Sequence, residues 1–206
     1  MSKKRNTRNT HKAQTSKKRG NSALVSDKIR IAEFANQGEW PKAQELLSKV
    51  LTQWPEDIEL QELQARIHHH CGNLDAAKQV LTSLLERHPT LKASLTRLSQ
   101  IVVDEGRLDE GLNLVNRALK ADPGFAEALV MKAHILYTQG HFTEALEINR
   151  HLLRLQPGNY IVWNNTGNTL RDLGRFAEAE EHYKKAITLS NTDSRPYANL
   201  LTTLHY

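Results

Sequence analysis

The feature that most constrains the fold of this chain is a glycine that returns every 34 residues. The glycines with this spacing are Gly38, Gly72, Gly106, Gly140 and Gly174. The prolines Pro55, Pro89, Pro123 and Pro157 keep the same interval. A small residue follows each glycine by five positions, at Ala43, Ala77, Gly111, Ala145 and Ala179. Three markers with one period predict a repeat protein rather than a domain with a single globular core.

Each repeat is predicted to be a pair of helices. Apolar residues recur at intervals of three and four, as in Leu129, Ala133 and Leu136, which is helical spacing. The glycine stands where a first helix is expected to end, because a residue with positive φ is a common C-terminal cap. The proline is expected to end a second helix, because it has no N–H to donate. The small residue is expected where the two helices cross closely. Such hairpins bury their remaining apolar side by stacking on neighbours.

This pattern resembles the tetratricopeptide repeat family over about residues 24–206. The fifth unit carries the fullest match, at Trp163, Gly167, Gly174, Phe176, Ala179, Tyr183 and Ala186. The resemblance implies an all-α, right-handed superhelical solenoid of about five helix-turn-helix repeats plus a C-terminal helix. The repeats would span about residues 24–57, 58–91, 92–125, 126–159 and 160–193, with a partial or capping helix at 194–206. The first unit departs from the pattern at Ile31 and Glu33, and the fifth has Asn191 in place of proline.

The resemblance also implies a function, since members of this family hold a partner's peptide or helix in a groove lined by the first helix of each pair. We therefore expect a protein-binding adaptor or scaffold. The residues at matching groove positions are Arg66, His69, His70, Arg97, Gln100, Met131, His134, Asn164, Asn165, Asn168 and Asn199. The chaperone-tail clamp of some relatives is not expected, because Lys28 is followed by Ala32 and the next unit has Leu63.

Two interpretations of the asparagines remain open. Asn165, Asn168 and Asn199 fit a ladder whose amides hydrogen-bond the backbone of an extended peptide. Polar residues on an exposed helix face are equally well explained by solvation alone.

The last helix suggests an alternative function. Residues 197–206 are similar to the segment that joins the repeats to the catalytic region in relatives of O-linked N-acetylglucosamine transferases. By that resemblance the chain would be the substrate-recognition arm of a longer glycosyltransferase. An ordinary solubilising cap, which terminal repeats commonly require, is the other interpretation of the same helix.

Charge is distributed unevenly along the chain. The net charge is +5, and residues 1–22 carry eight basic residues and no acid, so the remainder carries +5 − 8 = −3. We expect a disordered basic tail at residues 1–22, separate from a solenoid at residues 23–206. Candidate contacts for a polyanion such as nucleic acid are Lys3, Lys4, Arg5, Lys17, Lys18 and Arg19. A tail that is merely solvated is the plainer interpretation.

Other classes of function find little support in the sequence. It contains no phosphate-binding loop, nucleophile elbow or metalloprotease helix, so neither catalysis nor a cofactor is expected. The run from His68 to Cys71 does not predict a metal site, because consecutive helical residues point about 100° apart. No apolar run is long enough to span a membrane. A single cysteine, Cys71, indicates a reducing compartment, and the cytoplasm is the expected location.

Overall fold

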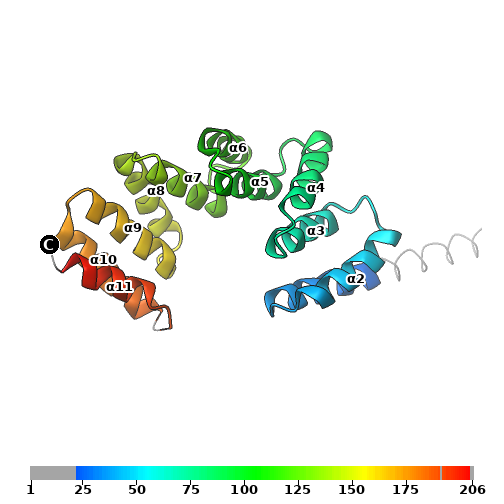
Figure 1. Cartoon of the computed structure of the whole chain (residues 1–206), viewed down its shortest axis with the longest axis horizontal. Coiled ribbons are helices and arrows are strands. Elements are labelled where there is room, and N and C mark those ends of the chain that lie inside the picture. Colours follow the sequence, from blue (N-terminus) through cyan, green and yellow to red (C-terminus); the bar gives the residue numbers. More distant parts are fainter. Residues whose placement is uncertain (1–21, 191, 205–206) are drawn as a thin grey trace, which may run out of the picture. The chain divides into compact units, whose positions relative to one another are not determined.

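The computed structural model describes residues 22–190 and 192–204, and every regular element among them is an α-helix. Residues 22–36 are helical. The helices that follow are α2 (Trp40–Gln53), α3 (Ile58–His70), α4 (Leu74–Arg87), α5 (Lys92–Asp104), α6 (Leu108–Ala121), α7 (Ala126–Thr138), α8 (Phe142–Leu155), α9 (Tyr160–Asp172), α10 (Phe176–Leu189) and α11 (Arg195–Thr203) (Figure 1). The predicted all-α repeat fold is confirmed.

The chain divides into two compact units, of which unit 1 extends to Arg87 and unit 2 begins at His88.

The 34-residue glycine shapes one turn that recurs along the chain. All five of these glycines have positive φ, from 75° at Gly174 to 84° at Gly106. After α9, the Gly174 N–H donates to the Arg171 carbonyl at 2.8 Å and the Arg175 N–H to the Leu170 carbonyl at 2.9 Å. This pair of bonds is the Schellman cap, which satisfies carbonyls that the helix leaves unpaired. The predicted role of the glycine is confirmed.

The second helix of each pair ends two residues before the repeat position at which the first four units have proline. Thus α4 ends at Arg87 before Pro89, and α8 ends at Leu155 before Pro157. A residue that precedes proline is pushed toward extended backbone, which explains the common endpoint. In the fifth unit α10 also ends two residues before this place, at Leu189, although the sequence has asparagine there. The proline therefore accompanies the helix end without being required for it.

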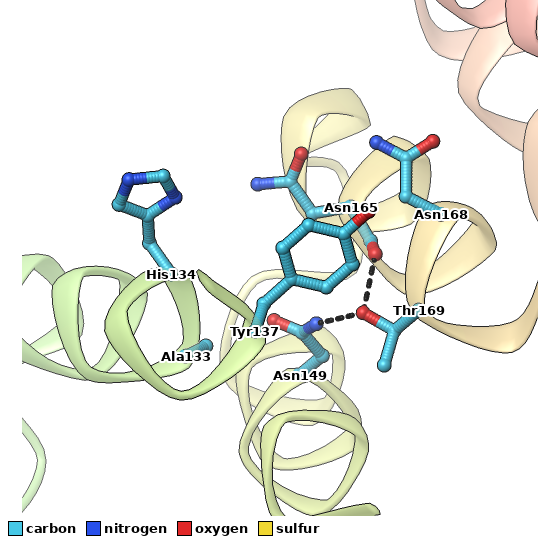
Figure 2. Close-up of a pocket in the computed structure, with 7 residues that line it drawn as sticks. All are labelled: Ala133, His134, Tyr137, Asn149, Asn165, Asn168 and Thr169. Atoms are coloured by element: carbon cyan, nitrogen blue, oxygen red, sulfur yellow. Dashed lines mark hydrogen bonds between the residues drawn. The ribbon is translucent and has the colours of Figure 1, made fainter. Parts of the chain in front are cut away.

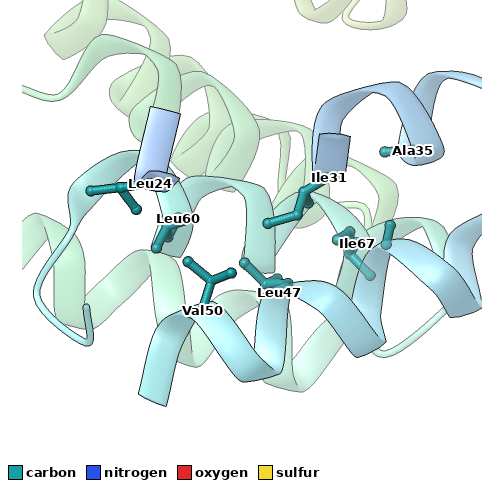
Figure 3. Packing of buried hydrophobic residues seen from close by; sticks show 8 residues of the cluster. Leu24, Ile31, Ala35, Leu47, Val50, Leu60 and Ile67 are labelled. Carbon is teal, nitrogen blue, oxygen red and sulfur yellow. The ribbon is translucent and has the colours of Figure 1, made fainter. Parts of the chain in front are cut away.

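Unit 1 has its own apolar core. Leu24, Ile31 and Ala35 of the first helix pack with residues from α2 and α3, as Figure 3 shows. Ile31, which departs from the repeat pattern, is fully buried in this cluster with Leu47. A larger side chain is thus accommodated at the crossing of the first helix pair.

Unit 2 consists of three successive helix pairs and the single helix α11. Helix α5 packs with α6, α7 with α8, and α9 with α10, while α11 lies against α10 and α9 (Figure 1). The helices of a pair approach closely at small residues. A Cβ atom on Gly111 would lie 2.4 Å from Val103 Cγ2, and one on Gly167 would lie 2.6 Å from Tyr183 Cε1. The small residues therefore set the spacing at which each pair packs.

Candidate functional site

Polar residues of three helices line a pocket of about 240 Å³ in unit 2. Helix α7 contributes one wall, α9 the opposite wall and α8 one side chain (Figure 2). The lining residues are Ala133, His134, Tyr137, Asn149, Asn165, Asn168 and Thr169. The first helices of the fourth and fifth predicted repeats thus meet here, and three predicted site residues, His134, Asn165 and Asn168, are brought together.

Tyr137 is held in place by a neighbouring acid. Its hydroxyl donates a hydrogen bond to the Asp172 carboxylate at the end of α9. Burial of the hydroxyl, together with this hydrogen bond, raises the pKa of Tyr137 to about 12. In Figure 2 the ring extends from α7 toward α9. Tyr137 is therefore a neutral and oriented aromatic side chain in the pocket.

The base of the pocket is a small polar network. Asn149 Nδ2 donates to Thr169 Oγ1 at 3.4 Å, and Thr169 Oγ1 donates to the Asn165 carbonyl at 2.9 Å (Figure 2). Asn149 and Thr169 are both buried. A buried polar group is costly unless it is paired, so these bonds stabilise a polar floor beneath the opening.

Two asparagine amides retain hydrogen-bonding capacity. Asn168 Oδ1 accepts from the Tyr183 hydroxyl at 2.9 Å, which fixes the orientation of the amide. Within the described part of the chain, neither the Asn168 Nδ2 group nor the side-chain amide of Asn165 is engaged in a hydrogen bond. The Asn165 amide offers both donors and an acceptor, as an extended backbone requires.

The other predicted residues of unit 2 lie outside this pocket. Asn164 is buried, and its Oδ1 accepts from Asn199 Nδ2 at 2.9 Å, so this pair holds α11 against α9. Met131 is buried in α7. Gln100 donates to Asp104 Oδ1 at 2.7 Å on α5, where Arg97 also lies. Their contact with a partner stays a prediction.

Three predicted residues lie on α3 in unit 1. The His70 ring stacks on Trp40 with 4.3 Å between ring centroids, and the His69 ring lies 6.0 Å from that of His70. Arg66 has two buried guanidinium nitrogens, Nε and Nη2, without a hydrogen-bond partner among the described residues. Arg66 stays a predicted contact for an acceptor group, whereas His70 has a packing contact at the first turn.

A wider hollow of about 440 Å³ in unit 1 is a weaker candidate. Two of its polar lining residues, Arg87 and Gln61, are already paired with each other. Arg87 bonds Glu56 and donates to Gln61 Oε1 at 2.6 Å. Surface polar groups that satisfy each other leave less for a ligand to bind.

Two other features considered in the sequence are the run from His68 to Cys71 and the basic tail. Among residues 22–190 and 192–204 no three His, Cys, Asp or Glu side chains converge in a way that would hold a metal ion. The tail residues from Lys3 to Arg19 lie outside the described residues. No helix in the described ranges has the length and apolar character that crossing a membrane requires.

Comparison with family models agrees with the helix pairs. A model described as a tetratricopeptide repeat matches residues 96–160 and again 130–194. A second model of the same description matches residues 35–98. These matches extend over well more than half of the 206 residues. The chain belongs to the tetratricopeptide repeat family.

Solved structures, among them tetratricopeptide repeat proteins, have the same fold. A thermophilic protein of this kind from Thermus thermophilus superposes with a TM-score of 0.76 at 18% identity, covering 89% of this chain and 100% of that one. For PilF of Pseudomonas aeruginosa the TM-score is 0.78 at 13% identity, covering 90% and 85%. YrrB, described as a tetratricopeptide repeat protein with an unusual peptide-binding site, gives 0.60 at 17%, covering 82% and 87%.

At these identities the likeness shows the fold alone. A search of curated protein sequences finds no match. None of these matches tests the similarity between residues 197–206 and the glycosyltransferase junction, which stays a prediction.

The sequence-based selection of groove positions missed Tyr137, Asn149 and Thr169. Tyr137 is four residues after Ala133 and so continues the apolar spacing of its helix, which by itself indicates a packing role. Asn149 replaces the apolar residue found 34 positions on either side, Val115 and Tyr183. An asparagine at a repeat position that is otherwise apolar was the feature of the sequence that could have predicted a polar floor.

Proposed function

We propose that this chain is a protein-binding adaptor in which the pocket between α7, α8 and α9 of unit 2 binds an extended peptide segment of a partner. Repeat proteins of this family serve in general as binding scaffolds rather than enzymes. The observation that carries the proposal is the Asn165 amide, which borders the pocket with no internal hydrogen bond among the described residues.

The chemistry of the pocket fits an extended backbone. Such a segment presents N–H and C=O groups that no helix or sheet has paired. The Asn165 amide and the Asn168 Nδ2 group supply hydrogen-bonding partners along α9. Tyr137 and Ala133 add apolar surface for one side chain of the peptide. Recognition is therefore expected to combine backbone hydrogen bonds with a single side-chain anchor.

The test uses peptides selected from a random phage-displayed library on the immobilised full chain. Their affinities are then measured by fluorescence anisotropy for the parent protein and for Asn165→Ala and His134→Ala. Loss of one net hydrogen bond costs about 1 kcal/mol, so Asn165→Ala should weaken binding about fivefold. His134→Ala removes an exposed ring from the same pocket and should also weaken binding.

Asn116→Ala provides the matched control. Asn116 is an exposed asparagine on α6, outside the pocket, and its truncation should leave the affinity unchanged. If selected peptides bind the Asn165→Ala and His134→Ala proteins as tightly as the parent, the pocket is not the peptide site. If Asn116→Ala weakens binding equally, the effect is not specific to the pocket.

A further inference from the structure

Helix α11 carries an exposed apolar stripe. Tyr197, Leu201 and Leu204 are 57%, 53% and 58% exposed, and their spacing of four and three residues places them on one helix face. A face about 100° away around the helix is occupied. Pro196 and Thr203 are buried, and Leu200 packs with the cluster that contains Tyr183. The stripe is thus the part of α11 that packing against α9 and α10 does not cover.

The 34-residue register shows what kind of neighbour the stripe fits. The equivalent residues on α9 are Trp163, Gly167 and Leu170, and all three face α10. Leu170 is fully buried, and Gly167 lies against the Tyr183 ring. The Trp163 and His182 rings are 5.1 Å apart. In the preceding pair, this face of α9 packs against the antiparallel helix α10. The stripe is the equivalent face of α11.

The N-terminal sequence has no matching set of apolar residues. Residues 1–21 contain only Met1 and Ala13 as hydrophobic residues, which are too few to cover the stripe. Helix α11 itself has the required face.

We propose that the stripe pairs with the same stripe on a second copy of this chain, around a twofold axis. A twofold axis perpendicular to α11 makes the two helices antiparallel, as α9 and α10 are within their hairpin. The contact is isologous, so one apolar face serves both copies.

The charge and size of the stripe are consistent with self-association. From Pro196 to Leu204 the sequence contains no Lys, Arg, Asp or Glu, so the two copies bring no like charges together. The nearest charge, Arg195, is paired with Asp193.

The size of Leu201 is also compatible with a helix pair. Leu201 occupies the repeat position at which other helix pairs have a small residue at their crossing. Ile31 has the same register, and it is fully buried in a cluster with Leu47. A crossing of two large aliphatic residues therefore already occurs in this chain.

The expected dimer is weak. A pair of nine-residue helices buries less surface than a standard stable interface, so we expect a Kd on the order of 10–100 µM.

Sedimentation velocity of the full chain provides the test, over about 5 to 500 µM so that both sides of the expected Kd are sampled. The species should shift from 23.4 kDa to twice that mass. Leu201→Glu should hold the protein monomeric, because it places a charge at the centre of the pair. Thr202→Glu adds the same charge to the next, exposed residue outside the stripe and should dimerise as the parent does. Leu155→Glu, an exposed leucine on α8, should also leave the dimer intact.

Cysteine cross-linking tests the symmetry. In a Cys71→Ser background, which removes the exposed native thiol, Leu201→Cys should give a covalent dimer with a short bismaleimide and Thr202→Cys should not. A protein that stays monomeric throughout overturns the proposal. So does a dimer that survives Leu201→Glu, an assembly larger than a dimer, or equal cross-linking at both positions. Circular dichroism confirms that each variant remains helical.

Discussion

Individual side chains in unit 2 combine packing with site geometry. Gly167 leaves the space into which the Tyr183 ring packs, and the Tyr183 hydroxyl then donates to Asn168 at the pocket. A residue with no side chain therefore contributes indirectly to the orientation of an amide on the pocket wall. The consequence is a coupling between the close crossing of α9 with α10 and the site.

Gly167→Ala should destabilise the protein by about 1–3 kcal/mol, because the added Cβ would lie 2.6 Å from the Tyr183 ring. The free energy of unfolding in urea gives the measurement. Gly158→Ala is the control, since no atom lies within 4 Å of the added Cβ. Its effect should stay within about 0.5 kcal/mol. Equal effects at the two sites would contradict the close crossing.

The Tyr137 hydroxyl should lose its proton at a higher pH than an ordinary tyrosine does. Its folded-state pKa of about 12 exceeds the ordinary value of 10.0, so the fold favours the neutral hydroxyl. That contribution to stability is complete below pH 10 and is lost as the pH rises through about 12. The ultraviolet titration of the parent minus that of Tyr137→Phe should show one phenol with a midpoint of about 12. A midpoint near 10 would mean that neither the burial of this hydroxyl nor its Asp172 hydrogen bond persists in solution.

Among the elements from α2 onward, α11 is the shortest helix. It is nine residues long, and the Asn199–Asn164 hydrogen bond is its polar link to α9. Asn164 is buried, so removal of its partner leaves a carbonyl oxygen unpaired. The helix that carries the apolar stripe is thus positioned by a residue that the sequence alone assigned to partner binding.

Asn199→Ala should loosen α11 specifically. Loss of the hydrogen bond costs about 1.4 kcal/mol locally, so amides of α11 should exchange with deuterium about tenfold faster. Thr202→Ala is the control, because the Thr202 hydroxyl bonds only within its own helix, to the Ala198 carbonyl. The anchoring role is refuted if both variants exchange alike, or if amides in α3 and α4 respond as strongly as those in α11.

At the scale of the whole molecule, stability is expected to be local. Repeat arrays are stabilised by contacts within and between neighbouring pairs, and each unit here has its own buried residues. We therefore expect a substitution to act mainly within the unit that contains it.

Two substitutions test this locality by hydrogen exchange. Leu47→Ala creates a cavity in the unit 1 cluster and costs about 2–5 kcal/mol, so it should accelerate exchange in α2 and α3. Gly167→Ala should instead accelerate exchange in α9 and α10. A uniform response of all helices to either substitution would indicate one cooperative core.

The sequence by itself determined the helix pairs, their turns and the family. A positive φ after each first helix and apolar spacing along each helix are local requirements, so they appear directly in the sequence at Gly72 or Gly140. His134, Asn165 and Asn168 were predicted on the groove-facing side from their repeat positions, and they line one pocket, while their contact with a partner stays a prediction.

The tertiary structure alone decided how polar residues from different helices combine. It placed Asn149 beneath Thr169, gave Tyr137 its Asp172 partner and buried Asn164 under α11. It also left the α11 stripe uncovered and divided the chain after Arg87. Periodicity gives the direction of a side chain from its own helix. Burial and hydrogen bonding depend on the neighbouring helix that packs against it, and that packing is a property of the folded chain.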